Sequence, residues 1–414
     1  MLETGRGGGD MRAEVIDGIA AWVVNCGLAG WSETDLLHGF CERCRDAGID
    51  LCRAITIIDT LHPIYEGRAF RWRNDGVEES FIVEYESTSE GPAAEKWRTG
   101  PFQHLLDIGG DEIRVRLDLN EPLRFSYLDK LKEEGQTDYV AFIHRFAGDG
   151  IIGEMDCVYS YWTTLHPEGF AEAELAALRR LLPSLALALK CASLKRISET
   201  LVEVYLGKDA GRRVLNGHIS RGVADRISAV LWFSDLRGYT RISDNAAPGE
   251  IIPLLNDYAE AVISAIHAAG GDVLKLIGDG VLAIFKADDA SDACRCALTA
   301  EANLRRELKE INERRAAANS PVTPVYLGLH IGEVFYGNIG SKDRLDFTVV
   351  GPAVNEVSRI ASMCRSVDRD VVISAEFAAR TPEPEKAGLV SVGRFALRGV
   401  GRAQDLFTLD PSVR

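Results

Sequence analysis

The sequence has no long run of apolar residues. None of its runs approaches the roughly 20 residues that a bilayer span needs. The first twelve residues, MLETGRGGGDMR, lack the apolar core of a signal peptide. We therefore expect a globular chain that stays in the cytoplasm and has no membrane partner. The glycine-rich residues 1–10 are expected to be disordered.

Positive charge is in the minority. The chain has 62 Asp and Glu residues against 47 Lys and Arg residues, which gives a formal net charge of −15. A chain with this balance repels polyanions rather than wrapping around them. Nucleic acid and anionic membrane surfaces are therefore not expected as partners.

The nine cysteines are not spaced as a metal site or as a disulfide framework. Cys41 and Cys44 form a CxxC pattern, and Cys294 and Cys296 form a CxC pattern, but neither has a second pair at zinc-like spacing. An odd number of cysteines in a chain without a signal peptide favours reduced thiols. We therefore expect neither a structural zinc nor a disulfide core.

The chain changes character near residue 190, because five of its six tryptophans precede that point. Residues 11–26 predict an amphipathic helix, and Ser32 is a plausible N-cap for a second helix. Several runs with β-strand character follow, namely RAITIID, ESFIVEY, EIRVRLDL, DYVAFIHRF and DCVYSYWT, before the helical segment GFAEAELAALRRLLPSLALALK. Helices flanking a mainly antiparallel sheet of five or six strands describe an α+β domain with one face free for a pocket.

In the order of these elements and in the closing helix, residues 1–190 resemble a GAF or PAS sensor domain. The resemblance implies a regulatory domain that responds to an unknown small-molecule or protein signal. Residues 191–225 are charged and helical, with Leu194, Ile197 and Leu201 on one stripe and several glycines after them. This segment is interpreted as a helical transducer linker, and a passive linker is the alternative.

The second half of the chain contains two aspartates at the ends of apolar segments. A predicted strand over 229–233 delivers Asp235, and a helix is expected at about 248–267. The segment GGDVLKLIGDGVLAIF then predicts a hairpin that turns at Asp279-Gly280. The order strand, helix and hairpin would bring Asp235 and Asp279 to the same end of a sheet. Two carboxylates would repel without a cation between them, so we expect bound metal of the kind used in nucleotidyl transfer.

Three motifs of this half, FSDLRGYT, LKLIGDGVLAIF and LDFTVVGPAVNEVSRIA, resemble the catalytic domain of class III adenylate and guanylate cyclases. We assign this domain to residues 226–414. The resemblance implies an α+β fold of the ferredoxin-like or polymerase-palm type, with an antiparallel-rich sheet and flanking helices. It also implies a homodimer whose two active sites are shared between the chains.

The resemblance gives a role to each residue that matches a family motif. Asp235 and Asp279 match the metal-binding aspartates, and the main-chain carbonyl of Leu236 is expected to join them around two Mg²⁺ or Mn²⁺ ions. Further matching positions are expected to bind the phosphates, namely the amides of Gly238, Tyr239 and Thr240, the side chain of Arg398 and, more loosely, that of Arg344.

Lys275 and Thr348 match the positions that read the base. A lysine ammonium offers only donors, which suits N1 of adenine and opposes the N1–H of guanine, and the threonine hydroxyl can accept from the exocyclic amine. Thr348 departs from the aspartate found in much of the mammalian branch. Asn355 and Arg359, four residues apart on one helical face, match the residues that orient the ribose and stabilise charge at the α-phosphate.

These matches imply an adenylate cyclase that converts ATP to 3′,5′-cyclic AMP and pyrophosphate and is regulated by residues 1–190. A cyclase for GTP or CTP is one alternative, because cytosine presents the same acceptor-and-amine edge as adenine. A catalytically silent nucleotide-binding dimer is the other alternative. Every position that the chemistry needs carries a competent residue type within one chain, which favours a catalytic homodimer.

Overall fold

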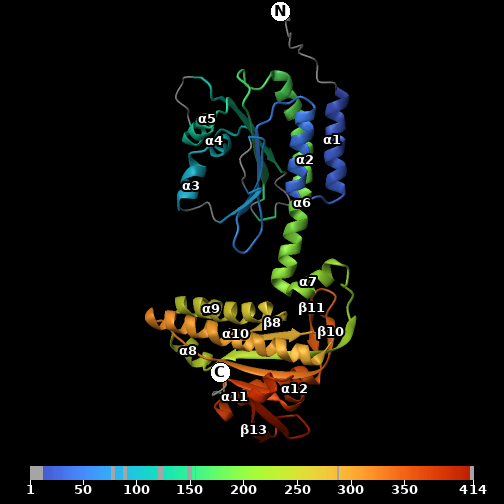
Figure 1. Cartoon of the computed structure of the whole chain (residues 1–414), viewed down its shortest axis with the longest axis vertical. Helices are drawn as coiled ribbons and strands as arrows, with labels where there is room; N and C mark the ends of the chain where they lie inside the picture. The colour runs from blue at the N-terminus through green and yellow to red at the C-terminus, as the bar shows by residue number, and fades with distance from the viewer. Residues whose placement is uncertain are drawn as a thin grey trace, which may run out of the picture. The chain divides into compact units, whose positions relative to one another are not determined.

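A computed structural model describes residues 13–75, 80–86, 91–119, 125–146, 152–153, 155–286 and 289–410. Two compact units, Met1–Leu201 and Val202–Arg414, make up the chain. Their elements are labelled in Figure 1. The predictions for residues 1–10 and for the first two residues of the first helix lie outside the described residues. Among the helices that the structure describes, none combines the length and the apolar character needed to cross a bilayer.

The N-terminal unit contains a six-stranded sheet with the order β3-β2-β1-β6-β5-β4. Every pairing in it is antiparallel. The strands are β1 (Arg53–Asp59), β2 (Gly67–Arg73), β3 (Ile82–Tyr85), β4 (Glu112–Arg116), β5 (Asp138–Arg145) and β6 (Cys157–Thr164). The predicted α+β class is confirmed, and β2 is a strand that the predicted runs did not include.

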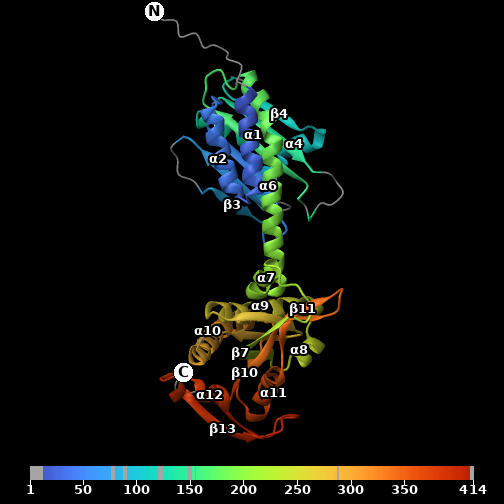
Figure 2. The same cartoon turned by 90° about the vertical axis from the view of Figure 1, so that its right-hand side faces the viewer.

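Helices cover both faces of this sheet (Figures 1 and 2). One face carries α1 (Ala13–Leu28), α2 (Glu33–Asp46) and α6 (Glu172–Leu206), and the other carries α3 (Gly91–Arg98), α4 (Pro101–Ile108) and α5 (Ser126–Glu133). Because successive strand residues point to opposite faces, Trp162 packs in the core with α1, α2 and α6, whereas Tyr161 packs under α4 and α5. As predicted, Ser32 caps α2, and its Oγ accepts a hydrogen bond from the Asp35 N–H at 3.2 Å.

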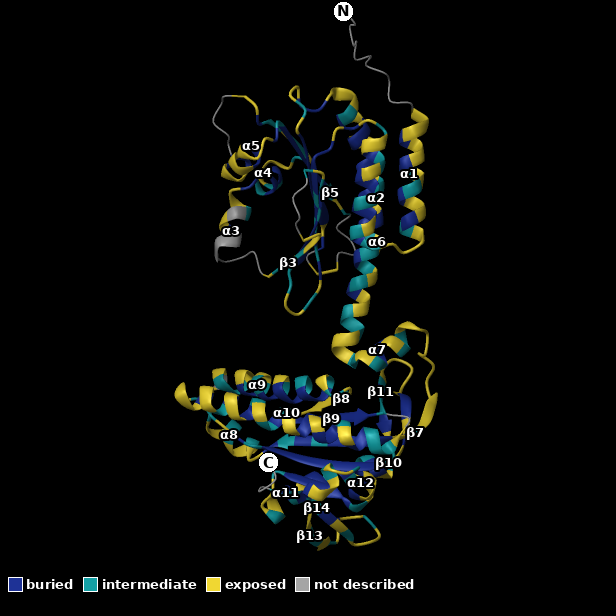
Figure 3. Ribbon diagram, viewed as in Figure 1, coloured by how far each residue is buried: buried dark blue, intermediate teal, exposed yellow. Residues whose placement is uncertain are grey.

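Helix α6 is longer than the sequence predicted. The helix expected to close the first domain near residue 190 continues to Leu206. Its first part is buried along one face, and most of its residues after Ile197 are exposed or half-buried (Figure 3). The short helix α7 (Lys208–Leu215) follows after Gly207. The first part of the predicted linker is therefore a continuation of the helix that packs on the sheet.

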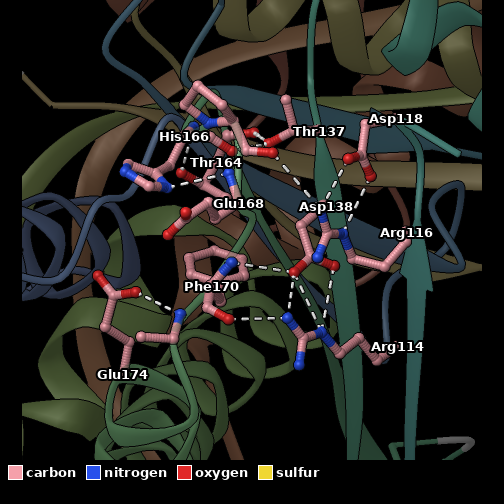
Figure 4. A network of polar contacts seen from close by, with 12 residues as sticks. Arg114, Arg116, Asp118, Thr137, Asp138, Thr164, His166, Glu168, Phe170 and Glu174 are labelled. Atoms are coloured by element: carbon pink, nitrogen blue, oxygen red, sulfur yellow. Dashed lines mark hydrogen bonds and ion pairs between the residues drawn. The ribbon is translucent and has the colours of Figure 1, made fainter.

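A buried carboxylate fixes the chain just before α6 to the sheet (Figure 4). Asp138, which is fully buried on β5, accepts hydrogen bonds from Arg114 Nη2 at 2.6 Å and from the Phe170 N–H at 3.0 Å. Arg114 Nη2 also donates to the Phe170 carbonyl at 2.7 Å. Because the charge on Asp138 is paired and hydrogen-bonded, it can be buried without a large desolvation penalty. The segment that enters α6 is thus held to β4 and β5.

The C-terminal unit contains an eight-stranded sheet. Seven strands follow the order β13-β14-β12-β10-β7-β9-β8, and β11 pairs with β10. The pairing of β10 with β12 is parallel and the others are antiparallel, so the antiparallel-rich α+β prediction is confirmed. The strands are β7 (Ala224–Leu236), β8 (Asp272–Ile277), β9 (Gly280–Phe285), β10 (Val325–Gly340), β11 (Leu345–Val350), β12 (Val371–Ser374), β13 (Leu389–Phe395) and β14 (Gln404–Leu409).

The helices of this unit again pack on both faces of the sheet (Figure 1). They are α8 (Tyr239–Asn245), α9 (Pro248–Ala268), α10 (Ala290–Ala317), α11 (Pro352–Val367) and α12 (Ala375–Arg380), with a short 3₁₀ helix at Glu385–Gly388. Helices α9, α10 and α12 share one core, and α7 and α11 share another. A Cβ at Gly328 on β10 would lie 2.6 Å from the Ala361 nitrogen of α11. Glycine therefore lets α11 approach the sheet closely.

Candidate active site

Asp235 and Asp279 lie together at one edge of the C-terminal sheet. Strand β7 pairs with β9 from Val230↔Phe285 to Ser234↔Val281, so the end of β7 meets the turn before β9. Asp279 Oδ2 accepts a hydrogen bond from the Leu236 N–H at 3.0 Å. The turn consists of Gly278 and Asp279, one residue earlier than predicted, because Gly278 rather than Gly280 takes the positive φ of 64°.

The carboxylate of Asp235 lies in an environment that disfavours its charge. Burial and the nearby Asp279 carboxylate raise the pKa of Asp235 to about 6. Asp235 Oδ1 is buried and has no hydrogen-bond partner among the described residues. A buried polar atom in this state destabilises the fold unless a ligand satisfies it. A divalent cation would satisfy the oxygen and remove the repulsion between the carboxylates, so the two aspartates fit a metal site.

The oxygen donors here suit hard cations such as Mg²⁺ and Mn²⁺. No group of three or more His, Cys, Asp or Glu side chains that could hold a metal occurs in the described ranges. Two carboxylates are therefore the side-chain contribution, and the remaining ligands would be main-chain oxygens such as that of Leu236, water and substrate. This ligand set is typical of Mg²⁺ sites that also bind phosphates.

A cavity of about 210 Å³ opens beside the two aspartates. Its walls come from the end of β7, the turn before β9 and one face of α9, and they include Asn256 and Tyr258. Neither α9 residue was predicted to line the site, because both lie outside the three motifs. The cavity gives the carboxylates a concave, partly apolar surrounding in which electrostatic interactions are stronger than in water.

The chain turns sharply directly after β7. Gly238 is exposed and has a left-handed conformation with φ of 70°, and α8 begins at the next residue, Tyr239. Nothing lies within 4 Å of where a Cβ of Gly238 would be, so glycine is favoured here by its conformation and not by crowding. The predicted phosphate-binding residues Gly238, Tyr239 and Thr240 thus form the first turn of α8, close in sequence to Asp235.

Lys275 and Thr348 lie on two neighbouring strands, β8 and β11. Lys275 is exposed on β8, and its ammonium group donates a hydrogen bond to the carboxylate of Asp346 on β11. Asp346 and Thr348 are two residues apart on one strand, so their side chains share a face. Sequence analysis missed Asp346, although the period-2 spacing from Thr348 was a signal that could have found it.

Arg359 and Arg398 come together from distant parts of the sequence. Asn355 and Arg359 lie one turn apart on α11, with Asn355 exposed and Arg359 half-buried. A Cβ at Gly399 would lie 3.1 Å from Arg359 Nη1, so the guanidinium packs over the turn that presents the exposed Arg398. The Arg359 guanidinium therefore lies against the backbone of the turn that contains Arg398.

One copy of the chain does not gather every predicted residue in one place. Lys275 lies on β8, whereas Asp279 lies in the turn after that strand. The ammonium group of Lys275 contacts Asp346 instead. Arg344 lies at the exposed tip of the β10–β11 hairpin, where its N–H donates to Ser341 Oγ at 3.1 Å. The predicted metal ligands and the predicted base-reading residues therefore lie on different segments of this unit, namely the end of β7 and the turn before β9 for the former and β8 and β11 for the latter.

Comparison with known proteins assigns this unit to a family. Residues 224–409 match the family described as the adenylate and guanylate cyclase catalytic domain. An adenylate cyclase of Anabaena cylindrica is 34% identical over 176 residues, which cover 42% of this chain and 34% of that protein. Adenylate cyclase 1 of Rhizobium meliloti is 28% identical over 217 residues, which cover 51% of this chain and 32% of that protein.

Among solved structures, the adenylyl cyclase CyaB from P. aeruginosa aligns with a TM-score of 0.41 at 24% identity, covering 45% of this chain and 95% of that one. The chain spans about a third of the length of the two curated relatives. The matched range includes all three sequence motifs and both aspartates. Residues 224–409 therefore belong to the adenylate and guanylate cyclase family.

Proposed function

We propose that this chain is an adenylate cyclase that converts ATP to 3′,5′-cyclic AMP and pyrophosphate. The observation that carries the proposal is the pair of carboxylates at the end of β7, where Asp235 has a buried, unpartnered oxygen and a pKa raised by burial and by Asp279. A family domain that has lost its chemistry has no reason to keep this unfavourable pair. Asp235, Asp279 and the carbonyl of Leu236 are the proposed ligands for Mg²⁺ or Mn²⁺, two ions per active site.

In the proposed reaction the ribose 3′-oxygen forms a bond to the α-phosphorus. The bond from that phosphorus to the pyrophosphate oxygen breaks, and the proton of the 3′-hydroxyl is lost. Bound divalent cations supply Lewis acidity for this hydroxyl and charge neutralisation for the leaving pyrophosphate. Arg359 and Arg398 offer guanidinium groups to the phosphate oxygens, where preorganised positive charge stabilises the transition state. Asn355 orients the ribose, and the Gly238, Tyr239 and Thr240 amides face the outer phosphates.

The base is proposed to be adenine. Lys275 donates to N1 and Thr348 accepts from the exocyclic amine, a pattern that guanine does not match. In the free chain Asp346 holds the ammonium group of Lys275 in place on β8. That contact supports the proposal, because a lysine with a fixed orientation loses less entropy when it binds the base.

The active site is proposed to be shared by two chains of a homodimer. Within one chain the ammonium group of Lys275 contacts Asp346 on β11, whereas Asp279 accepts a hydrogen bond from the Leu236 N–H at the end of β7. Each chain would then give its aspartates to one site and its Lys275, Asn355 and Arg359 to the other. These different partners of Asp279 and Lys275 within one chain support this division.

The N-terminal unit is proposed to be a GAF- or PAS-like sensor that regulates the cyclase through α6 and α7. Asp209 on α7 accepts hydrogen bonds from Lys286 Nζ at 2.6 Å and from Tyr336 Oη at 2.8 Å, which fix α7 to the cyclase unit. A Cβ at Gly207 would lie 2.6 Å from the carbonyl oxygen of Val273 on β8. The turn after α6 therefore packs directly on the strand that carries Lys275, so a displacement of this turn would reach the proposed base site.

We also propose that the protein acts in the cytoplasm. Its substrate, ATP, is abundant there, and all nine cysteines are free thiols, most of them buried. Free thiols are typical of a reducing compartment.

The test of the proposed function is an incubation of the full chain with Mn²⁺ or Mg²⁺ and each of ATP, GTP, CTP and UTP. We expect cyclic AMP and pyrophosphate from ATP, identified by chromatography and mass spectrometry. Cyclic GMP or cyclic CMP as the main product would overturn the assignment of the base. A complete lack of cyclic nucleotide with all four substrates and both metals would favour the silent dimer.

A further inference from the structure

A second cavity lies in the N-terminal unit, between the sheet and helix α5. Its volume is about 470 Å³, which is within the range of roughly 300–1,000 Å³ that is typical of pockets for small molecules. One wall is formed by residues of β1, β2 and β6, and the other by Ser126, Tyr127, Lys130, Leu131 and Glu134 of α5 and its C-terminal end. The spacing of these α5 residues places them on one helical face.

The sheet wall carries three arginines. The register pairs Arg53 of β1 directly with Arg73 of β2, and it pairs Ile55 with Arg71. Like charges directly opposite each other destabilise an antiparallel pair. Asp75 reduces the repulsion between Arg53 and Arg73, because its carboxylate accepts hydrogen bonds from Arg53 Nε at 2.8 Å and from Arg73 Nη2 at 2.7 Å. One carboxylate thus serves two guanidinium groups, and Arg71 adds a third positive charge to the same wall.

The helix wall adds a fourth cation and one acid. Lys130 Nζ lies 3.9 Å from Glu134 Oε1, and Glu134 also forms an ion pair with Arg53. Of the described residues that line the cavity, four are cationic and only Glu134 is acidic. With Asp75, which pairs with two of the arginines, the described residues at this cavity still include four cationic groups against two carboxylates.

The floor of the cavity is aromatic and apolar. The hydroxyl groups of Tyr127 on α5 and Tyr161 on β6 are 2.9 Å apart and hydrogen-bonded. Burial raises the pKa of both phenols, so they remain neutral donors and acceptors at neutral pH. Ile55 and Leu131 supply apolar surface beside them. The cavity therefore combines positively charged groups with flat and apolar surface.

We propose that this cavity binds a small organic dianion with a planar body, such as an aromatic dicarboxylate or a phosphate monoester. Guanidinium groups bind carboxylates and phosphates through pairs of parallel hydrogen bonds, and a lysine adds a point charge. Arg71 and Lys130 would bind the acidic groups, while Asp75 and Glu134 hold Arg53 in place. The tyrosines would contact the planar body. This inference does not depend on the reaction of the other unit, because it concerns binding alone.

The test is isothermal titration calorimetry of the full chain, without nucleotide, using isophthalate and phenyl phosphate as probes and benzyl alcohol as the neutral counterpart. We expect at least one dianion to bind with a dissociation constant below about 1 mM, and the neutral probe not to bind. Arg71→Gln should weaken binding about tenfold, and Lys130→Gln about threefold, because each removes a charged hydrogen-bond donor. Arg180→Gln is the matched control, since this arginine is exposed on α6 and pairs with Asp17.

The choice of probes and variants makes each outcome decisive. Binding of isophthalate alone would identify a dicarboxylate site, and binding of phenyl phosphate alone would identify a phosphate ester site. The proposal is overturned if neither dianion binds, or if Arg71→Gln and Lys130→Gln bind as tightly as the wild type. Lys130 is 76% exposed in its side chain, so its variant keeps the fold even if the Arg71 variant does not. A loss of cyclase activity would leave these results unaffected.

Discussion

The two units of this chain each contain a cavity in which charges of one sign are crowded together. In the C-terminal unit two carboxylates meet, and one of them has a buried oxygen without a partner. In the N-terminal unit four cationic side chains line one cavity, and two of them oppose each other across a strand pair. Without counter-charges, neither group of like charges would favour folding. Both are accounted for by ligands of opposite charge, namely divalent cations in the first cavity and an organic anion in the second.

The acidic cavity at Asp235 and Asp279 and the cationic cavity of the N-terminal unit differ in whether the chain itself supplies opposite charges. Asp75 and Glu134 neutralise part of the cationic cavity within the chain itself. The acidic cavity has no comparable internal cation among its described lining residues. We therefore expect the acidic cavity to depend more strongly on its ligand than the cationic cavity does.

Removal of one carboxylate from the acidic cavity should have the largest effect. Asp279→Ala removes a proposed metal ligand and the acceptor of the Leu236 N–H bond. We expect cyclase activity to fall by about 1,000-fold or more, because a positioned cation contributes several kcal/mol to catalysis. Asp292→Asn is the matched control, since Asp292 lies on α10 and pairs only locally with Arg295. Retention of more than about a tenth of the activity in Asp279→Ala would argue against metal binding there.

Disruption of the cationic cavity should instead reduce stability. Arg53→Gln removes the guanidinium that forms ion pairs with both Asp75 and Glu134, so each carboxylate loses one ion pair. We expect the free energy of unfolding of the N-terminal unit to fall by about 3 kcal/mol, because one partner of a largely buried ion pair is lost. Urea denaturation measures this change. The control Arg180→Gln should stay within about 0.5 kcal/mol of the wild type, as is usual for exposed sites.

Replacement of Asp235 in the acidic cavity by a neutral residue should instead increase the free energy of unfolding. The pKa of Asp235 is about 6 in the folded chain against 3.8 for an unperturbed group, so folding disfavours its charged form. Without metal, Asp235→Asn should raise the free energy of unfolding by on the order of 1–2 kcal/mol at pH 7.5. The gain should be fully present above pH 6 and vanish below about pH 4, where the wild-type carboxyl is protonated in both states.

Saturating Mg²⁺ should reduce the difference in the free energy of unfolding between Asp235→Asn and the wild type. The reason is that the cation stabilises the ionised pair of carboxylates in the wild type and not the variant. Thermal unfolding followed by circular dichroism, at several pH values with and without Mg²⁺, measures both effects. A metal-free Asp235→Asn variant that is less stable than the wild type at pH 7.5 would contradict the assigned repulsion.

The C-terminal unit was the more predictable of the two, for a physical reason. Several of its strands contain apolar runs, and all its predicted site residues except Arg344 and Arg398 lie within three short motifs, so local sequence places Asp235 and Asp279 at strand ends. The position of the turn differed by one residue, because Gly278 and Gly280 both tolerate positive φ and only the strand register selects between them. The contact of Lys275 with Asp346 depends on tertiary structure and could be inferred only from strand periodicity.

The N-terminal unit was less predictable, because its functional residues do not form a motif. Strand β2 contains three arginines in seven residues, which conceals its strand character. Two of its arginines, Arg71 and Arg73, line the cavity only because β2 pairs with β1 and α5 packs opposite them. Helix α6 continued past the predicted boundary near residue 190, because neither proline nor glycine occurs between that boundary and Gly207. The cationic cavity was therefore visible only once the strands were placed side by side.

The most direct test of the proposed two-chain active site is a complementation experiment. Asp235→Ala and Arg359→Ala chains, each expected to be inactive alone, are co-expressed so that they can form mixed dimers. Because each mixed dimer would contain one intact site, we predict that the mixture recovers about a quarter of the wild-type activity with ATP. If co-expression restores no activity while mixed dimers are present by native mass spectrometry, the assignment of these residues to complementary halves of a shared site is wrong.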